Sequence, residues 1–161
     1  MNAALLHDPS AVLAAAYAGA NTSVTAGGGG DATEVDGAYV LVEDAEGISF
    51  LIGFTATLGA DETLTIAGNL QDADDASGTG VADYGTAIAA TVVATGPSGG
   101  GTVTGVAIVT ASTAGMREAC RVQFTPNLSA GSTDTAALSC VAIMGGAKRL
   151  PAAFSNMTRL N

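Results

Sequence analysis

Residues 47–70 read GISFLIGFTATLGADETLTIAGNL, and this stretch decides the fold class. Apolar side chains recur at alternate positions in both halves, a period of two that places them on one face of a β-strand. The residues at 59–62, GADE, are typical of a turn. The stretch therefore predicts a β-hairpin with one apolar face, which a second sheet must cover. That face comprises Phe50, Ile52, Phe54, Ala56, Leu58, Leu64, Ile66 and Leu70.

Further short strands are predicted on both sides of this hairpin. In the strand at 117–125, Cys120, Val122 and Phe124 should point inward, and Pro126 should end it. In the strand at 102–110, Val106 and Ile108 should point inward. Seven or eight short strands separated by turns indicate an all-β protein, an antiparallel β-sandwich or jelly roll. The remaining strands are expected at 38–45, 84–93 and 138–144, the last apolar on both faces and therefore central or covered.

The N-terminal region, residues 1–36, is predicted to be an arm. Asp8 and Pro9 form a suitable helix start, and an apolar stripe with Leu13 and Tyr17 follows them. The four glycines at 27–30 indicate a flexible linker or a loop laid along a partner. The predicted organisation is an arm with a short helix at 1–36, a sandwich domain at 37–151 and a C-terminal tail at 152–161.

Charge is distributed very unevenly along the 161 residues. The net charge is −10, yet residues 1–116 carry thirteen acids and no Lys or Arg, whereas residues 117–161 carry two acids and all five bases. An acidic body repels nucleic acid and anionic lipid, so neither is an expected partner. The basic segment either docks on an acidic protein surface or balances local acids, and the sequence leaves both interpretations open.

No segment predicts export or membrane insertion. No apolar run reaches the ~18 residues of a membrane span, and the N-terminus, MNAALLHDPS, lacks the basic residues of a secretory signal. We therefore expect synthesis and use without export. Cys120 and Cys140 should then be reduced core thiols, although a disulfide remains an alternative under oxidising conditions.

Candidate catalytic and metal-binding residues give a weak pattern. The acidic loop with Asp72, Asp74 and Asp75 could hold Ca²⁺, but its spacing departs from the EF-hand pattern, so a solvated acidic loop is favoured. The glycine clusters lack the Lys-Ser/Thr ending of a phosphate loop. The single histidine, His7, lies in the predicted arm, away from any nucleophile in the sandwich. No enzymatic activity and no cofactor are expected.

The order of these features resembles a known class of proteins. The strand pair SFLIGFTATLGADETLTIAGNLQDADD, the Arg-led strand MREACRVQFTP and the final LSCVAIMGGAKRLP are similar to the decoration, or cement, proteins of tailed bacteriophages. The similarity covers roughly residues 36–151. It implies a non-enzymatic virion protein of jelly-roll or sandwich type, made in the host cytoplasm, that sits on the outer capsid surface.

In such a protein the partner would be the major capsid protein, and the chain would form a dimer or trimer. Burial of apolar arm and edge surface across the joints between capsid subunits would cement the shell. Other virion parts, such as a tail tube or head fibre, and a carbohydrate-binding or adhesin-like module remain alternatives. The predicted partner-binding residues are those of the arm, Leu5, Leu6, Val12, Leu13 and Tyr17, and those of the basic tail, Lys148, Arg149, Leu150 and Arg159.

Overall fold

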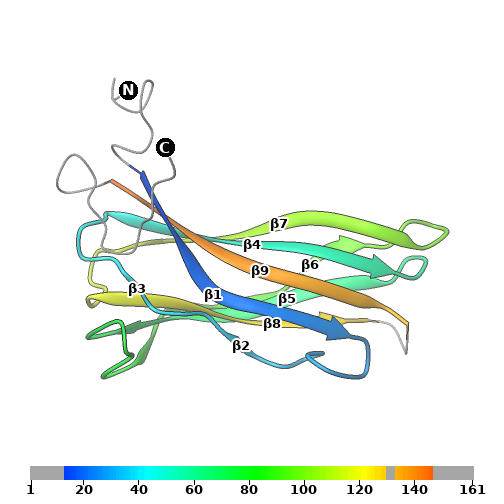
Figure 1. The fold of residues 1–161 in the computed structure, drawn as a ribbon, viewed down its shortest axis with the longest axis horizontal. Helices are drawn as coiled ribbons and strands as arrows, with labels where there is room; N and C mark the ends of the chain where they lie inside the picture. The colour runs from blue at the N-terminus through cyan, green and yellow to red at the C-terminus, as the bar shows by residue number, and fades with distance from the viewer. Residues whose placement is uncertain (1–12, 130–132, 147–161) are drawn as a thin grey trace, which may run out of the picture.

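The computed structural model describes residues 13–129 and 133–146, and every regular element in these ranges is a β-strand. The strands form two antiparallel sheets packed face to face (Figure 1). We call the sheet with the order β1-β9-β4-β7 sheet A, and the sheet with the order β2-β8-β5-β6 sheet B; β3 also pairs with β8. The strands are β1 (Leu13–Thr25), β2 (Val35–Asp36), β3 (Val40–Leu41), β4 (Gly47–Leu58), β5 (Thr63–Ala73), β6 (Ala82–Thr95), β7 (Gly101–Ser112), β8 (Ala119–Leu128) and β9 (Thr135–Gly145).

The connections between strands identify the topology. The chain passes from one sheet to the other after β1, β3, β4, β6, β7 and β8, and it stays within one sheet at the β2–β3 and β5–β6 connections. Two sheets wound together in this way form a jelly roll. The predicted all-β sandwich is thereby confirmed, with β2 and β3 together occupying the place of one interrupted strand.

The predicted hairpin at 47–70 is wrong in its pairing, although both strands exist. β4 pairs with β7 and β9 in sheet A, whereas β5 pairs with β6 and β8 in sheet B. The link between them therefore crosses the sandwich, and the backbone N–H of Gly59 donates to Oδ1 of Asp134 at 2.9 Å at this corner. Alternation shows which side chains face inward, but a strand has the same alternation in either sheet.

The core lies between the two sheets, where the inward rows of side chains meet. Phe50 and Ile52 of β4 and Val122 and Phe124 of β8 are fully buried. The apolar faces predicted for β4, β5 and β8 are thus confirmed. The strand predicted to be either central or covered is β9, and it is central, since it lies between β1 and β4.

The predicted helix of the arm is wrong wherever the structure describes it. Residues 13–25 form β1, the edge strand of sheet A, which pairs with β9 through a register shift between Tyr17 and Asn21. Gly19, with φ of 70°, lies within that shift. The buried side chains of β1 are small and recur at every second residue, at Ala14, Ala16, Ala18 and Ala20. This strand period is hard to recognise in the sequence, because alanine is also the best helix former.

Two details of β7 and β8 also differ from the expectation. Val106 and Ile108, predicted to point inward, are 56 % and 64 % exposed, because the alternate positions of β7 face the core. Pro126, predicted to end its strand, is buried within β8. Its carbonyl accepts from the N–H of Ala32 at 2.9 Å, on the side away from β5, so the missing proline N–H is not needed by the β5 ladder.

Candidate interaction surface

All four strands of sheet A lack charged residues. Their sequences are LAAAYAGANTSVT, GISFLIGFTATL, GTVTGVAIVTAS and TAALSCVAIMG. The side chains that point away from the core, at odd positions of β1, β4 and β9 and even positions of β7, form the surface that we call the outer face of sheet A. In a chain of net charge −10, a whole sheet face without a charge is a distinct surface.

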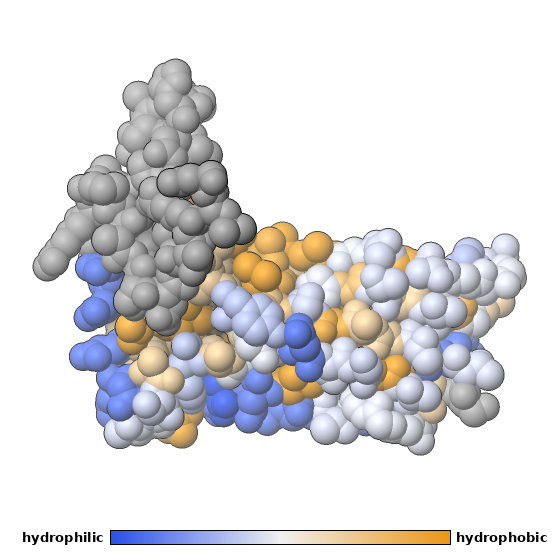
Figure 2. All heavy atoms as spheres, in the orientation of Figure 1, coloured by the Kyte–Doolittle hydropathy of each residue, from blue (hydrophilic) through white to orange (hydrophobic). Residues whose placement is uncertain are grey.

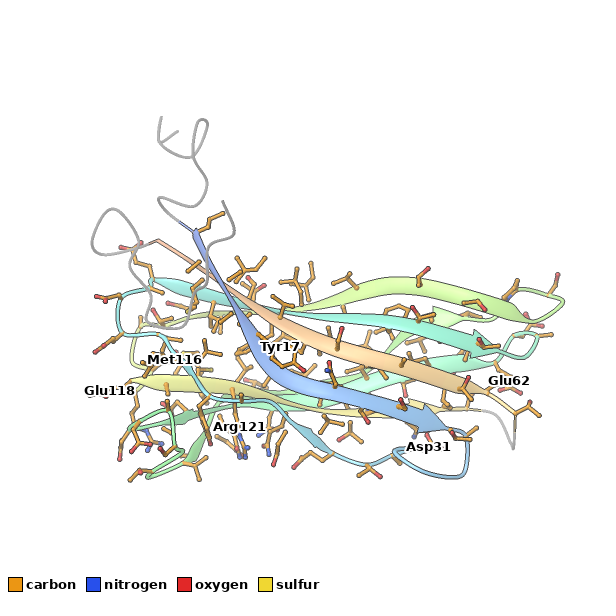
Figure 3. The ribbon with its side chains drawn as sticks, viewed as in Figure 1. Tyr17, Asp31, Glu62, Met116, Glu118 and Arg121 are labelled. Atoms are coloured by element: carbon orange, nitrogen blue, oxygen red, sulfur yellow. The ribbon has the colours of Figure 1, made fainter. Side chains whose placement is uncertain are left out.

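Large apolar side chains align across this outer face. The register places Tyr17 opposite Val141, Val141 opposite Leu51, and Leu51 opposite Ile108, which makes one row across all four strands. Tyr17 is 60 % exposed and Val141 is 40 % exposed. Tyr17 lies on β1 in Figure 3, and apolar or weakly polar surface extends over β4 and β7 in Figure 2. Short hydroxyl side chains fill most of the remaining positions.

A shallow hollow of about 600 Å³ lies beside this row. It forms around Gly53 of β4, where a side chain is missing between the neighbouring strands. Its outer rim includes Thr55, Val106 and Ser139. The hollow is lined by uncharged groups throughout, so it suits an apolar or hydroxyl-bearing protuberance of a partner rather than an ion.

Charged side chains gather on sheet B and on the loops. Asp36, Asp72, Asp83 and Arg121 lie on its strands. Strongly hydrophilic surface accordingly collects at the side of the molecule where β2, β3 and the β5–β6 loop lie (Figure 2). The two faces of the sandwich therefore differ in electrostatic character, and the outer face of sheet A is the one that can be desolvated at low cost.

The acidic loop between β5 and β6 is closed by Arg117. Its guanidinium contacts Asp72 at 2.8 Å and Asp74 at 3.4 Å, and it also donates to the carbonyl of Gly80. The hydrogen bond with Asp72 raises the pKa of Arg117 above its ordinary value. Hydrogen bonds from the hydroxyl and backbone of Thr79 lower the pKa of Asp75.

The carboxylates of the acidic loop are engaged by Arg117 and Thr79 and do not converge on a common point where a cation could bind. Among residues 13–129 and 133–146, no group of three or more His, Cys, Asp or Glu side chains could hold a metal ion. Across the same ranges, no helix is long and apolar enough to cross a membrane. The loop is tied down by its own hydrogen bonds and by one arginine.

Arg121 is also satisfied within the fold. It forms an ion pair with Asp36 at 3.3 Å, donates to Oε1 of Gln71 at 2.8 Å, and stacks over the ring of Tyr39 at 4.9 Å. For Arg117 and Arg121, the structure therefore supports the interpretation that bases balance local acids. The predicted tail contacts, Lys148, Arg149, Leu150 and Arg159, lie outside the described residues.

Two of the nine predicted contact residues fall on the outer face of sheet A. Leu13 and Tyr17 both occupy odd positions of β1, although they do so on a strand and not on the expected helix. Leu5, Leu6 and Val12 lie outside the described residues, as does His7. Sequence reasoning missed the contributions of β4, β7 and β9. For β7, the charge-free stretch from residue 84 to 116 was the available signal.

The two cysteines occupy opposite sheets of the core. Cys120 lies on β8 of sheet B and Cys140 on β9 of sheet A; both are buried and free. Burial raises the pKa of Cys120 to about 12 and that of Cys140 to about 11. Their predicted place in the core is confirmed, and neither thiol has the lowered pKa of a nucleophile.

Comparisons with known proteins find likeness at the level of structure. No protein-family model matches the chain, and no curated protein matches it. Among solved structures, the chain is similar to that of the Gx strain of infectious bursal disease virus, with 14 % identity over 88 % of this chain and 34 % of the other, and a TM-score of 0.43. T=1 particles derived from the same virus give 11 % identity, 86 % and 32 % coverage, and a TM-score of 0.45. The chain thus spans about a third of the length of these structures.

Proposed function

We propose that this chain is a structural virion protein that binds the outer capsid surface and cements neighbouring major capsid subunits. The observation that carries the proposal is the charge-free outer face of sheet A, in a protein whose other face and loops are acidic. A soluble acidic protein needs one such surface if it is to dock without burying unpaired carboxylates. The sequence resemblance to phage decoration proteins supports the same function.

The side chains of this surface suit a permanent contact. Val, Thr, Ser and Ala have few rotatable bonds, so they lose little conformational entropy when a partner covers them. The row through Tyr17 and Ile108 would supply the apolar centre of the contact, and the hydroxyl groups around it would hydrogen-bond at the rim. A protein attached at many equivalent positions on a shell turns modest affinity at each site into strong reinforcement of the particle.

The experiment uses virions with and without the gene for this chain. We expect the protein in purified wild-type particles at a fixed stoichiometry, and we expect particles without it to release their genome at lower temperature. Adding the purified protein back should restore both occupancy and heat resistance. Absence of the protein from purified particles, or equal heat resistance of the two kinds of particle, would refute cementing.

A pair of matched variants locates the contact. Tyr17→Glu places a carboxylate in the outer face, and burying it unpaired should reduce affinity for the particle by more than about tenfold. Val81→Glu makes the same charge change at a residue that is 47 % exposed in the β5–β6 loop, away from sheet A, and should bind normally. Equal occupancy by both variants would show that sheet A does not face the capsid.

A further inference from the structure

Among the strands of residues 13–129 and 133–146, β7 is the long edge strand with the least protection against pairing with another chain. It matches β4 residue for residue, from Gly47 opposite Ser112 to Leu58 opposite Gly101, with no register shift. The other edges are interrupted: β1 and β6 have register shifts, and β2 and β3 have two residues each. Charges, prolines and bulges normally protect free edges, and β7 has none of them.

The backbone of β7 presents a regular row of hydrogen-bonding groups at this edge. The N–H of Thr113 donates to the carbonyl of Glu46 at 3.1 Å, while Gly47 lies opposite Ser112. In an antiparallel ladder this geometry makes the odd residues of β7 the ones that bond to β4. The even residues, 102 to 112, therefore direct their N–H and C=O groups to the free side. The hydroxyl of Tyr84 on β6 lies on this side and contacts the carbonyls of Ser112 and Ala114, at 3.1 and 2.9 Å, so it covers one end of the edge and leaves residues 102–110 open.

We propose that β7 pairs antiparallel with β7 of a second copy, about a two-fold axis through Ala107. In this register Val106 of each copy lies opposite Ile108 of the other. Thr104 then lies opposite Thr110, so the open even residues of β7 from 104 to 110 meet even residues of the partner, and the pairing ends before Ser112, which Tyr84 covers. The two sheets A join into one continuous sheet of eight strands, with β7 of both copies at its centre.

This register places apolar side chains opposite each other as well as pairing the backbone groups. Val106 and Ile108 are the two large apolar residues that β7 exposes, and shifting the partner by two residues in either direction would place a Thr opposite one of them. β-Branched pairs directly opposite each other are among the favourable cross-strand pairs. Antiparallel association about a two-fold axis is also the common way in which identical surfaces meet.

Charge explains why a second copy fits this edge. Two copies with a net charge of −10 repel each other, and contact is cheapest where the surface is neutral. Residues 84–116, which include all of β6 from Tyr84 onward and all of β7, contain no charged side chain. The strands next to the two-fold contact, β7 and the part of β6 from Tyr84 onward, therefore bring no charged side chain to the junction. The inference concerns the free edge of β7 and does not rest on capsid docking, although the side chains of Val106 and Ile108 also belong to the outer face of sheet A.

The first experiment measures the oligomeric state of the full-length protein in solution, by light scattering coupled to gel filtration and by sedimentation. We expect a dimer. Ile108→Pro removes an N–H that points to the free edge and leaves the bonds to β4 intact, so it should give a folded monomer. The double variant V106K/I108K places lysines opposite lysines and should also be monomeric. Circular dichroism verifies that each variant keeps its β-structure.

A matched control separates edge pairing from contact through the outer face. Val141→Lys introduces the same lysine on the same outer face, but on β9, which lies between β1 and β4. We expect this variant to remain a dimer. A monomeric or trimeric wild type would overturn the proposal. So would a dimer that survives both β7 changes or that dissociates with Val141→Lys, because either result would place the contact elsewhere.

A cross-link tests the register itself. Ala107→Cys places two thiols opposite each other on the two-fold axis, in a non-hydrogen-bonded pair whose Cα separation of about 4.5 Å suits a disulfide. We expect mild oxidation to give a covalent dimer, while the buried native thiols stay unreactive. Val109→Cys also points toward the core side of β7 but would lie opposite Gly105, and should not cross-link. Cross-linking through residue 109 and not through residue 107 would refute the proposed axis.

Discussion

Nε and Nη2 of Arg117 both donate to the same carboxylate oxygen of Asp72, at 3.1 and 2.8 Å. The backbone N–H of Arg117 donates to the other oxygen of Asp72 at 3.1 Å. Asp72 is buried at the end of β5, whereas Asp74, the second partner of Arg117, is largely exposed. One arginine thus connects the start of the β8 segment to the β5–β6 loop.

Replacing Arg117 should therefore destabilise the protein mainly through Asp72. Arg117→Ala leaves a buried carboxylate without its charged partner, so the melting temperature should fall. Arg117→Lys should have a melting temperature between those of Arg117→Ala and the wild type, because an ammonium cannot donate in the same fork geometry as a guanidinium. Asp74→Asn should change the melting temperature much less than Asp72→Asn, because exposed pairs contribute only ~0–1 kcal/mol. Equal effects of the two aspartate changes would contradict this order.

Two strand glycines should respond oppositely to the same substitution. A methyl group at Gly68 of β5 would overlap the carbonyl oxygen of Gln123 on β8 and come within 3.0 Å of Cα of Phe124. At Gly53 the nearest atom would be Oγ of Ser139, at 3.8 Å. Gly68→Ala should cost about 1–3 kcal/mol of unfolding free energy. Gly53→Ala should be neutral or stabilising by up to about 1 kcal/mol, with urea denaturation as the measurement.

Deleting residues 1–30 should prevent stable folding. The deletion removes β1, whose Ala14, Ala18 and Val24 side chains are buried in the core. It also leaves the β1 side of β9 unpaired along most of its length. A chain that begins at residue 13 keeps β1 and should retain a cooperative thermal transition. If the chain beginning at residue 31 melted at the wild-type temperature, β1 would not belong to the cooperative unit.

The buried thiols should make stability depend on pH in the alkaline range. An unfolded cysteine loses its proton near pH 9, whereas burial raises the pKa of Cys120 to about 12 and that of Cys140 to about 11. The thiols' contribution is therefore fully present below about pH 9 and is lost as the pH rises toward 11–12. The free energy of unfolding, measured by urea titration at a series of pH values, should fall more steeply above pH 9 in the wild type than in a variant with both cysteines changed to alanine. Parallel curves would show that the thiols are hydrated in the folded state.

Sequence alone predicted the inward faces of β4, β5 and β8 because one face of each is consistently apolar. It failed for β7, where Val103 and Val109 face the core while Val106 and Ile108 face solvent, so both faces contain β-branched residues. It failed for β1 because alanines at alternate positions also suit a helix. In each case the period of two was present, but the chemical contrast between the faces was too small to reveal it.

The candidate surface could be predicted only in pieces. Each strand of sheet A is visibly uncharged in the sequence, but the row from Tyr17 to Ile108 joins residues 91 positions apart through the register of four strands. The assumed β4–β5 hairpin also divided the outer face incorrectly, since it placed β5 beside β4 where β7 and β9 lie. Long-range pairing, and not local composition, assembles the surface.

The pairing of β1 with β9 also sets the order in which the protein can fold during synthesis. Leu13 lies opposite Gly145, so sheet A is complete only when residue 145 has left the ribosome. Until then, the other strands of sheet A are unpaired, and they are uncharged and have strong β-propensity. Unpaired strands of this kind favour aggregation of nascent chains. Within residues 1–116 every charged side chain is acidic, apart from the single histidine. This segment is therefore negative, and we expect mutual repulsion between neighbouring nascent chains to protect the strands of sheet A until β9 is made.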